Sequence, residues 1–101
     1  MAQFDVYPNP DPERADLFPY FVDIQNDLHA KLGVRVVIPL SRETFTIEHL
    51  MPVVDVKGEK LTLSVPDLSS VPSLICIAPV DNLSRYRNEI VDALDFLVNG
   101  F

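Results

Sequence analysis

Few residues of this chain have types and spacings that could carry out chemistry. Its only histidines, His29 and His49, are not spaced as two metal ligands one helical turn apart would be. The only cysteine, Cys76, lies in the apolar run at residues 74–78, where burial would raise its thiol pKa. We therefore predict two surface histidines and a buried structural cysteine, and we predict no catalytic residue, metal site or cofactor site from these residues.

Glycines and carboxylates complete this inventory. Three glycines in the whole chain cannot build a phosphate-binding loop. Three aspartates could act as paired carboxylates in acid–base chemistry only if folding brings them together, and these are Asp23, Asp27 and Asp55. We expect instead that the charged residues form a solvated face.

Composition limits the classes of function. The 101 residues predict one domain, residues 1–101. A net charge of −7, from 15 acids against 8 bases, disfavours direct binding to nucleic acid but allows a basic protein partner. A single cysteine excludes an internal disulfide and fits a reducing cytosol. We expect no signal peptide and no membrane span, because the start is not basic and no apolar run is long enough.

The elements that must position any site are mostly short strands. Apolar alternation or unbroken apolar runs predict strands at residues 3–7, 20–26, 35–40, 53–56, 60–65 and 74–78. The first two are expected to pair, and Gly58 between the fourth and fifth predicts a hairpin. The proline-rich residues 8–16 are expected to form a mobile loop, and residues 28–33 and 66–72 to be connections.

The last nineteen residues, 83–101, predict a helix with two unlike faces. Its apolar stripe is formed by Leu83, Tyr86, Ile90, Leu94, Leu97 and Phe101. The opposite, solvated stripe is formed by Asn88, Asp92, Asp95 and Asn99, with Phe96 beside it. Candidate N-terminal caps are Asp81, Asn82 and Ser84, and Gly100 suits the end of the helix. The pattern alone is typical of a terminal helix that covers a small barrel or sandwich.

Several local strings, in order and at matching total length, resemble one family of toxins. The strings are Gln3-Phe4 with Val6-Tyr7, Phe21-Val22-Asp23-Ile24-Gln25 with Asp27, Val37-Ile38-Pro39-Leu40, Pro52-Val53-Val54, Ser70-Val71-Pro72, Leu83-Ser84, and Asn88, Ile90, Ala93 and Gly100. The chain thus resembles the CcdB family, the toxins of toxin–antitoxin modules that poison DNA gyrase. The resemblance implies a mainly β fold with α, a small SH3-like barrel of the CcdB/MazF-like plasmid toxin type with a C-terminal helix.

The same resemblance implies the function and the partners. It implies a cytoplasmic homodimer that binds the gyrase A subunit and traps gyrase on cleaved DNA, without being an enzyme. A CcdA-like antitoxin would neutralise it, and DNA would be reached only through the antitoxin or gyrase. It also associates the chain with plasmid maintenance and transcription autoregulation. We expect the dimer from the residues as well, because Phe96, Val98 and Phe101 add apolar surface near one end.

The resemblance also implies which residues bind gyrase. They are the last three residues, three outward helix positions and the loop after the second strand: Asn99, Gly100 and Phe101; Asn88, Asp92 and Asp95; and Leu28 and His29. The best-known family member has tryptophan at Asn99, asparagine at Asp95 and isoleucine at Phe101, so an aromatic anchor is lost at Asn99. Two alternatives stay open: a related barrel toxin that cleaves mRNA, and a non-toxic chromosomal relative that binds only an antitoxin.

Overall fold

The computed structural model describes residues 2–43 and 46–100, apart from the side chains of His29 and Ala30. Its strands are β1 (Asp5–Pro8), β2 (Tyr20–Asp23), β3 (Val34–Ser41), β4 (Val53–Val56), β5 (Glu59–Leu63), β6 (Ser69–Pro72) and β7 (Asp81–Asn82). The 3-10 helices η1 (Asp27–Leu32), η2 (Val65–Asp67), η3 (Ser73–Ile75) and η4 (Ser84–Tyr86) connect them, and the chain ends in the α-helix α1 (Arg87–Asn99).

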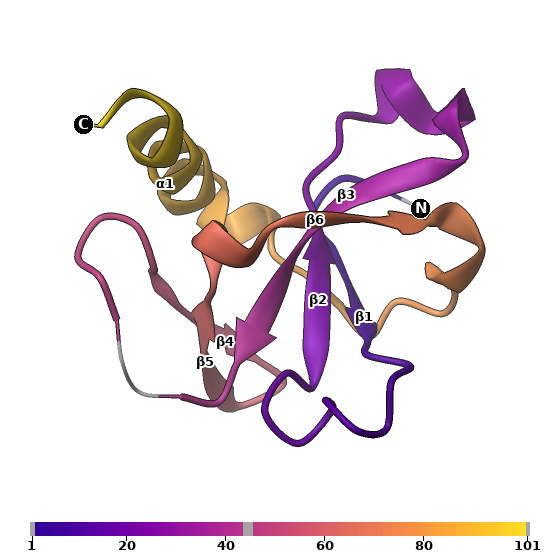
Figure 1. Ribbon diagram of the computed structural model, residues 1–101, viewed down its shortest axis with the longest axis horizontal. Coiled ribbons are helices and arrows are strands. Elements are labelled where there is room, and N and C mark those ends of the chain that lie inside the picture. The colour runs from indigo at the N-terminus through magenta and orange to yellow at the C-terminus, as the bar shows by residue number, and fades with distance from the viewer. Residues whose placement is uncertain (1, 44–45, 101) are drawn as a thin grey trace.

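The strands form one antiparallel sheet in the order β4-β5-β3-β2-β1-β7. Strand β3 is central because it pairs with β2 on one side and with two strands on the other. Its first half pairs with β6, from Val34↔Pro72 to Val37↔Ser69, and its end pairs with β5 at Leu40↔Leu63. This division of partners bends the sheet into a nearly closed barrel with α1 at one corner (Figure 1). The predicted fold class, mainly β with a C-terminal helix on a small barrel, is confirmed.

The seam between the edge strands β4 and β7 is joined by side chains from η4. The Asp55 amide on β4 donates to the Tyr86 hydroxyl oxygen at 3.0 Å. The Arg85 guanidinium donates to the Asp55 carbonyl at 2.6 Å and also to the Asp81 carboxylate on β7. Two side chains therefore satisfy backbone groups of an edge strand that a further strand would otherwise take.

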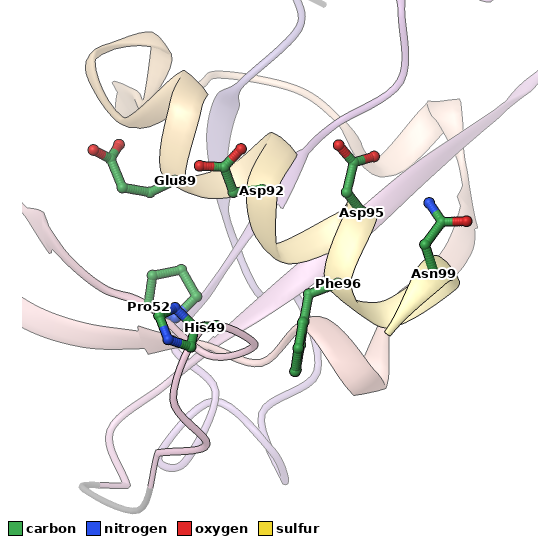
Figure 2. Close-up of a pocket in the computed structure, with 7 residues that line it drawn as sticks. All are labelled: His49, Pro52, Glu89, Asp92, Asp95, Phe96 and Asn99. Carbon is green, nitrogen blue, oxygen red and sulfur yellow. The ribbon is translucent and has the colours of Figure 1, made fainter. Parts of the chain in front are cut away.

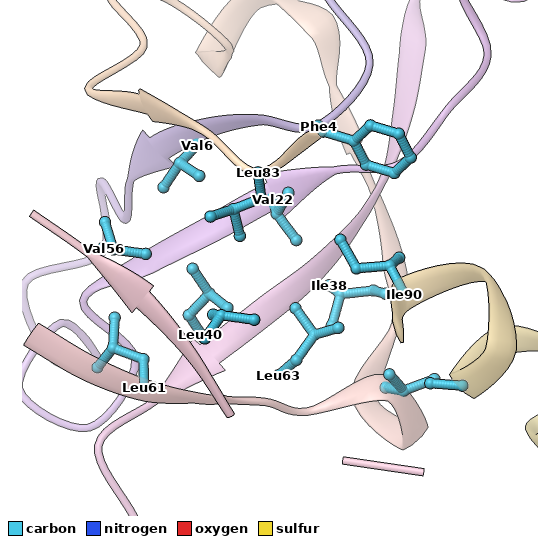
Figure 3. Close-up of a cluster of buried hydrophobic side chains, with 13 residues drawn as sticks. Phe4, Val6, Val22, Ile38, Leu40, Val56, Leu61, Leu63, Leu83 and Ile90 are labelled. Atoms are coloured by element: carbon cyan, nitrogen blue, oxygen red, sulfur yellow. The ribbon is translucent and has the colours of Figure 1, made fainter. Parts of the chain in front are cut away.

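One apolar cluster fills the barrel (Figure 3). Its buried members are Phe4, Val6, Val22, Ile38, Leu40, Val54, Val56, Leu61, Leu63, Val65, Leu83, Ile90 and Ala93. The last two are the buried residues of α1, so the helix closes the barrel with a narrow apolar stripe. The predicted stripe is correct through Leu94, which is half-buried, but Leu97 is exposed.

The predicted pairing of the first two strands and the predicted hairpin are both confirmed. Strands β1 and β2 pair with Val6 opposite Val22. Between β4 and β5, Lys57 and Gly58 have φ of 52° and 87°, as a two-residue turn of type I′ requires. The Asp55 carboxylate accepts the Gly58 amide at 2.9 Å, which closes the turn.

Two predictions about the second half of the chain are wrong. The expected loop at residues 66–72 contains β6, and the expected strand at residues 74–78 is instead η3 and the segment after it. Leu74 and Ile77 are 86% and 70% exposed, although their run is apolar. The more polar residues 69–72 pair with β3 as β6, so this edge of β3 is not open to the apolar residues 74–78. Pairing at the edge of a sheet uses backbone hydrogen bonds, so it does not require apolar side chains.

Two predicted element boundaries are also wrong. The second strand ends at Asp23 and is followed, after a short link, by η1, where only a connection was expected. The α-helix begins at Arg87, because Asp81 and Asn82 pair with β1 as β7. Asn82 still caps locally, since its side-chain oxygen accepts the Ser84 amide at 2.8 Å at the start of η4.

Candidate functional site

A groove of about 710 Å³ runs between α1 and the loop that precedes β4. Seven side chains line it: His49, Pro52, Glu89, Asp92, Asp95, Phe96 and Asn99. Figure 2 shows the polar side chains in a row along α1, and Phe96 pointing toward the loop that carries His49 and Pro52. The groove therefore combines an apolar floor with a row of carboxylates.

The orientation of α1 follows from the two residues that it buries. Ile90 and Ala93 are one turn apart and face the barrel, so positions on the opposite side of the helix face solvent. Asp92, Asp95 and Asn99 occupy that side and are all exposed. Packing of the barrel fixes where these three side chains lie, although none of them contributes to the core.

An aromatic contact joins the loop side of the groove to α1. The His49 ring lies 6.2 Å from the Phe96 ring, centroid to centroid, at an interplanar angle of 58°. His49 has a left-handed backbone with φ of 66°, and its Nε2 lies 3.5 Å from the Glu48 carboxylate. The histidine is exposed, as predicted, but it borders the groove.

Charge gives the groove its chemical character. Three of its lining residues carry carboxylates and none is a lysine or arginine. A surface of this kind complements a positively charged partner and orients its approach. Among the residues that the structure describes, no group of three His, Cys, Asp or Glu could hold a metal ion.

The structure brings together only some of the predicted binding residues. Asp92, Asp95 and Asn99 line the groove, whereas Asn88 is exposed one turn earlier on the same helix and lies outside the lining. Gly100 has φ of 79° and ends α1 by donating its amide to the Phe96 carbonyl at 2.8 Å, as the sequence predicts.

The remaining predicted residues lie elsewhere. Leu28 is on η1, outside the groove lining, and its side chain is 87% exposed. In Figure 1 both η1 and the end of α1 lie on the upper side of the molecule, α1 at the left and η1 at the right. The backbone of His29 belongs to η1, but its side chain lies outside the described residues, and so does Phe101. One chain therefore presents the predicted contacts as two separate patches.

Sequence reasoning placed Phe96 beside the outward stripe of α1 but missed three other residues of the groove. Glu89 precedes Phe96 by seven residues, two helical turns, so this spacing could have added it to the same side of the helix. His49 and Pro52 carried no such signal, because they belong to an irregular loop whose position depends on the fold.

A buried ion cluster corrects the expectation of a solvated charged face. Arg35 on β3 and Asp23 on β2 are fully buried, and Nε of Arg35 donates to Asp23 Oδ2 at 2.7 Å. Nη2 of Arg35 reaches Asp27 Oδ1 at 3.3 Å. Asp55, the third aspartate considered for a carboxylate pair, lies on β4 instead. Burial raises the pKa of the Asp23 carboxyl, and hydrogen bonds from Arg35 and the Gln25 amide oppose that rise. Among the described residues, Nη1 of Arg35 has no partner.

Cys76 is buried, as predicted, and it lies near the ion cluster. Burial raises the pKa of its thiol, and the negative charge of Asp23 adds to that rise. A protonated thiol is a poor nucleophile, which supports a structural role for this residue.

Three exposed apolar residues lie on adjoining segments of η1, β3 and η3. They are Leu32, Val34 and Leu74, and we refer to them as the apolar patch. The Ser73 amide donates to the Gly33 carbonyl at 3.0 Å, so the segments carrying these side chains adjoin.

No helix within the described part of the chain has the length and apolar character that a membrane crossing requires.

Comparison with known families agrees with the fold and with the resemblance in the sequence. A family model described as CcdB protein matches residues 3–100, almost the whole chain. The match includes the barrel, η1 and the groove face of α1 up to Gly100. The chain therefore belongs to the CcdB family, and so to the toxins of toxin–antitoxin systems.

Proposed function

We propose that this toxin binds the A subunit of DNA gyrase and traps the gyrase–cleaved DNA complex, thereby inhibiting topoisomerase activity without being an enzyme itself. The observation that carries the proposal is the outward face of α1. Asp92, Asp95 and Asn99 are exposed, line a groove, and are not needed for the core. The other proposed gyrase-binding residues are Leu28, His29, Asn88, Gly100 and Phe101.

Charge supports a protein partner over a nucleic acid. The chain has a net charge of −7, and three of its carboxylates line the groove, where no lysine or arginine accompanies them. A phosphate backbone would be repelled by this surface, whereas a basic patch on a DNA-handling protein would be attracted to it. DNA would then be reached only through gyrase or the antitoxin.

A homodimer and a CcdA-like antitoxin complete the proposal. The apolar patch of Leu32, Val34 and Leu74 is the surface that we assign to the second copy, since exposed apolar patches commonly close on a twofold axis. The dimer would supply two copies of each binding patch. The antitoxin would occupy the toxin in the cytoplasm and release it when degraded.

The test is expression without an antitoxin, followed by reactions with purified gyrase. We expect growth arrest, accumulation of cleaved DNA linked to gyrase, and no cleavage of purified RNA. Arrest accompanied by RNA cleavage would replace the proposal with the mRNA-cleaving alternative. Normal growth, with no cleaved complexes in vitro, would identify a non-toxic relative that binds only an antitoxin.

A further inference from the structure

Helix η1 carries Leu28 but has almost no apolar anchor. None of its described side chains is buried, and Leu28 and Leu32 both face solvent. Figure 1 shows η1 projecting beyond the start of β3. A short helix without a buried face is not stable by itself, so contacts at its ends must hold it in place.

The contacts at the ends of η1 are polar. The Asn26 side chain accepts the Leu28 amide at 2.9 Å, which shapes the first turn but does not attach it to the sheet. At the other end, the Gly33 carbonyl accepts the Ser73 amide. Arg35 makes the link between the first turn and the barrel, since its Nη2 donates to Asp27 Oδ1 at 3.3 Å and to the Gln25 carbonyl at 3.2 Å.

The guanidinium of Arg35 is itself held in place by the sheet. It is fully buried on β3 and is held by Asp23 on the neighbouring strand at 2.7 Å. The planar fork of arginine lets Nε and Nη2 hold two carboxylates at once, which a lysine could not do in the same geometry. The position of Asp27 is thereby tied to the centre of the sheet, although its own side chain is 58% exposed.

We propose that Arg35 and Asp27 are positioning residues that hold η1 so that Leu28 is presented to gyrase. This inference rests on the proposed function and extends it to residues that do not themselves touch the partner. It agrees with the small net stability of partly exposed ion pairs, because such a pair can hold a segment in place without being needed for the fold. Removing the Asp27 carboxylate should loosen η1 while leaving the barrel intact.

The test uses Asp27→Asn, because changes at Arg35 would leave Asp23 buried without its cation. We expect the amides of η1 to exchange hydrogen faster and the melting temperature to stay unchanged. We expect the affinity for the purified gyrase A subunit to fall by about twofold to fivefold, the range of a partly exposed ion pair. Asp27→Glu should restore most of the affinity, and the matched control Glu13→Gln, with the same change of charge, should have none of these effects.

A double-mutant cycle with Leu28→Ala separates positioning from simple charge loss. If Asp27 acts through Leu28, Asp27→Asn should cause a smaller loss of affinity in the Leu28→Ala background than in the unaltered protein, the rest being carried by His29 on the same helix. An equal loss in both backgrounds, or unchanged exchange of the η1 amides, would overturn the inference. If the unaltered protein does not bind gyrase A, the proposed function fails, and amide exchange still decides whether Asp27 holds η1.

Discussion

Asp92 and Asp95 are neighbours on the outward face of α1, and both carboxylates border the groove. Neither side chain makes a hydrogen bond or ion pair within the described residues, and neither packs in the core. Both carboxylates can therefore interact with a partner without breaking a contact within the chain. A change of charge at either position should affect binding more than folding. Their substitution is the most direct test of the groove.

We predict that Asp92→Lys and Asp95→Lys each weaken binding to the gyrase A subunit by about tenfold or more, because like charges across an interface cost several kcal/mol. The free energy of unfolding should change by no more than about 0.5 kcal/mol, as at other exposed positions. Titration calorimetry and chemical denaturation measure the two effects. Glu13→Lys is the matched control, and equal loss of affinity in that variant would show that net charge, not the groove, is responsible.

The Asp81–Arg85 ion pair gives the protein a defined response to acid. Hydrogen bonds from Arg85 hold the pKa of Asp81 below its usual value of 3.8. A carboxyl group with a lowered folded-state pKa stabilises the fold fully above its unfolded pKa, and this contribution is lost as the pH falls through the folded-state pKa. The contribution should therefore be complete at neutral pH and decline below about pH 4.

We predict that Asp81→Asn lowers the free energy of unfolding at pH 7 by about 0.2–1 kcal/mol, the range of partly exposed ion pairs. The difference from the unaltered protein should shrink as the pH falls below about 4, where both proteins carry a neutral side chain at this position. Urea denaturation at pH 7 and pH 3 gives both values. A difference that stays constant with pH would contradict the assignment.

At the scale of elements, α1 depends on very few core contacts. Ile90 is fully buried in the barrel, whereas Val98 near the end of the same helix is 78% exposed. We predict that Ile90→Ala costs about 2–5 kcal/mol of unfolding free energy, the range for large-to-small core changes. Val98→Ala, the control on the same helix, should cost less than about 0.5 kcal/mol. Thermal denaturation of both variants measures this, and equal losses would show that α1 is not docked as described.

The elements that the sequence predicts well are those in which periodicity and packing agree. Strands β1 and β2, the hairpin around Gly58 and the inward stripe of α1 all follow local patterns. The apolar run at residues 74–78 led to a wrong prediction, because it lies outside the sheet. The more polar segment before it forms β6 and pairs with β3 instead. Segments far apart in the chain compete to pair with β3. A local sequence pattern cannot predict which of them does so.

The candidate site was predictable to the same extent. The outward residues of α1 follow from helical spacing, and the family resemblance adds the role that spacing cannot supply. The loop residues His49 and Pro52, and the burial of Asp23 with Arg35, depend on contacts between segments far apart in the chain. Such contacts could not be read from one sequence without the fold.

At the scale of the whole molecule, the apolar patch is the surface that we assign to a second copy. We predict that Leu74→Lys weakens dimer association by about tenfold or more, because a buried lysine without a partner costs more than about 1.4 kcal/mol. Sedimentation over a range of concentrations measures the association. Val53→Lys changes another exposed apolar residue, on β4, and should leave association unaltered. Equal effects of both substitutions, or a monomer before any substitution, would contradict the assignment.

The pairing of β1 with β7 joins two segments that lie far apart in the chain, with Asp5 opposite Asn82 and Val6 opposite Asp81. A ribosome adds about 5–20 residues per second, so β1 waits for several seconds before its second neighbour has been made. Helix α1, which covers the barrel and carries the groove, follows β7 in the chain and is synthesised after it. The nascent chain therefore lacks both its closed barrel and the outward face of α1 that we assign to gyrase until β7 and α1 have been made, and toxicity should begin only after that.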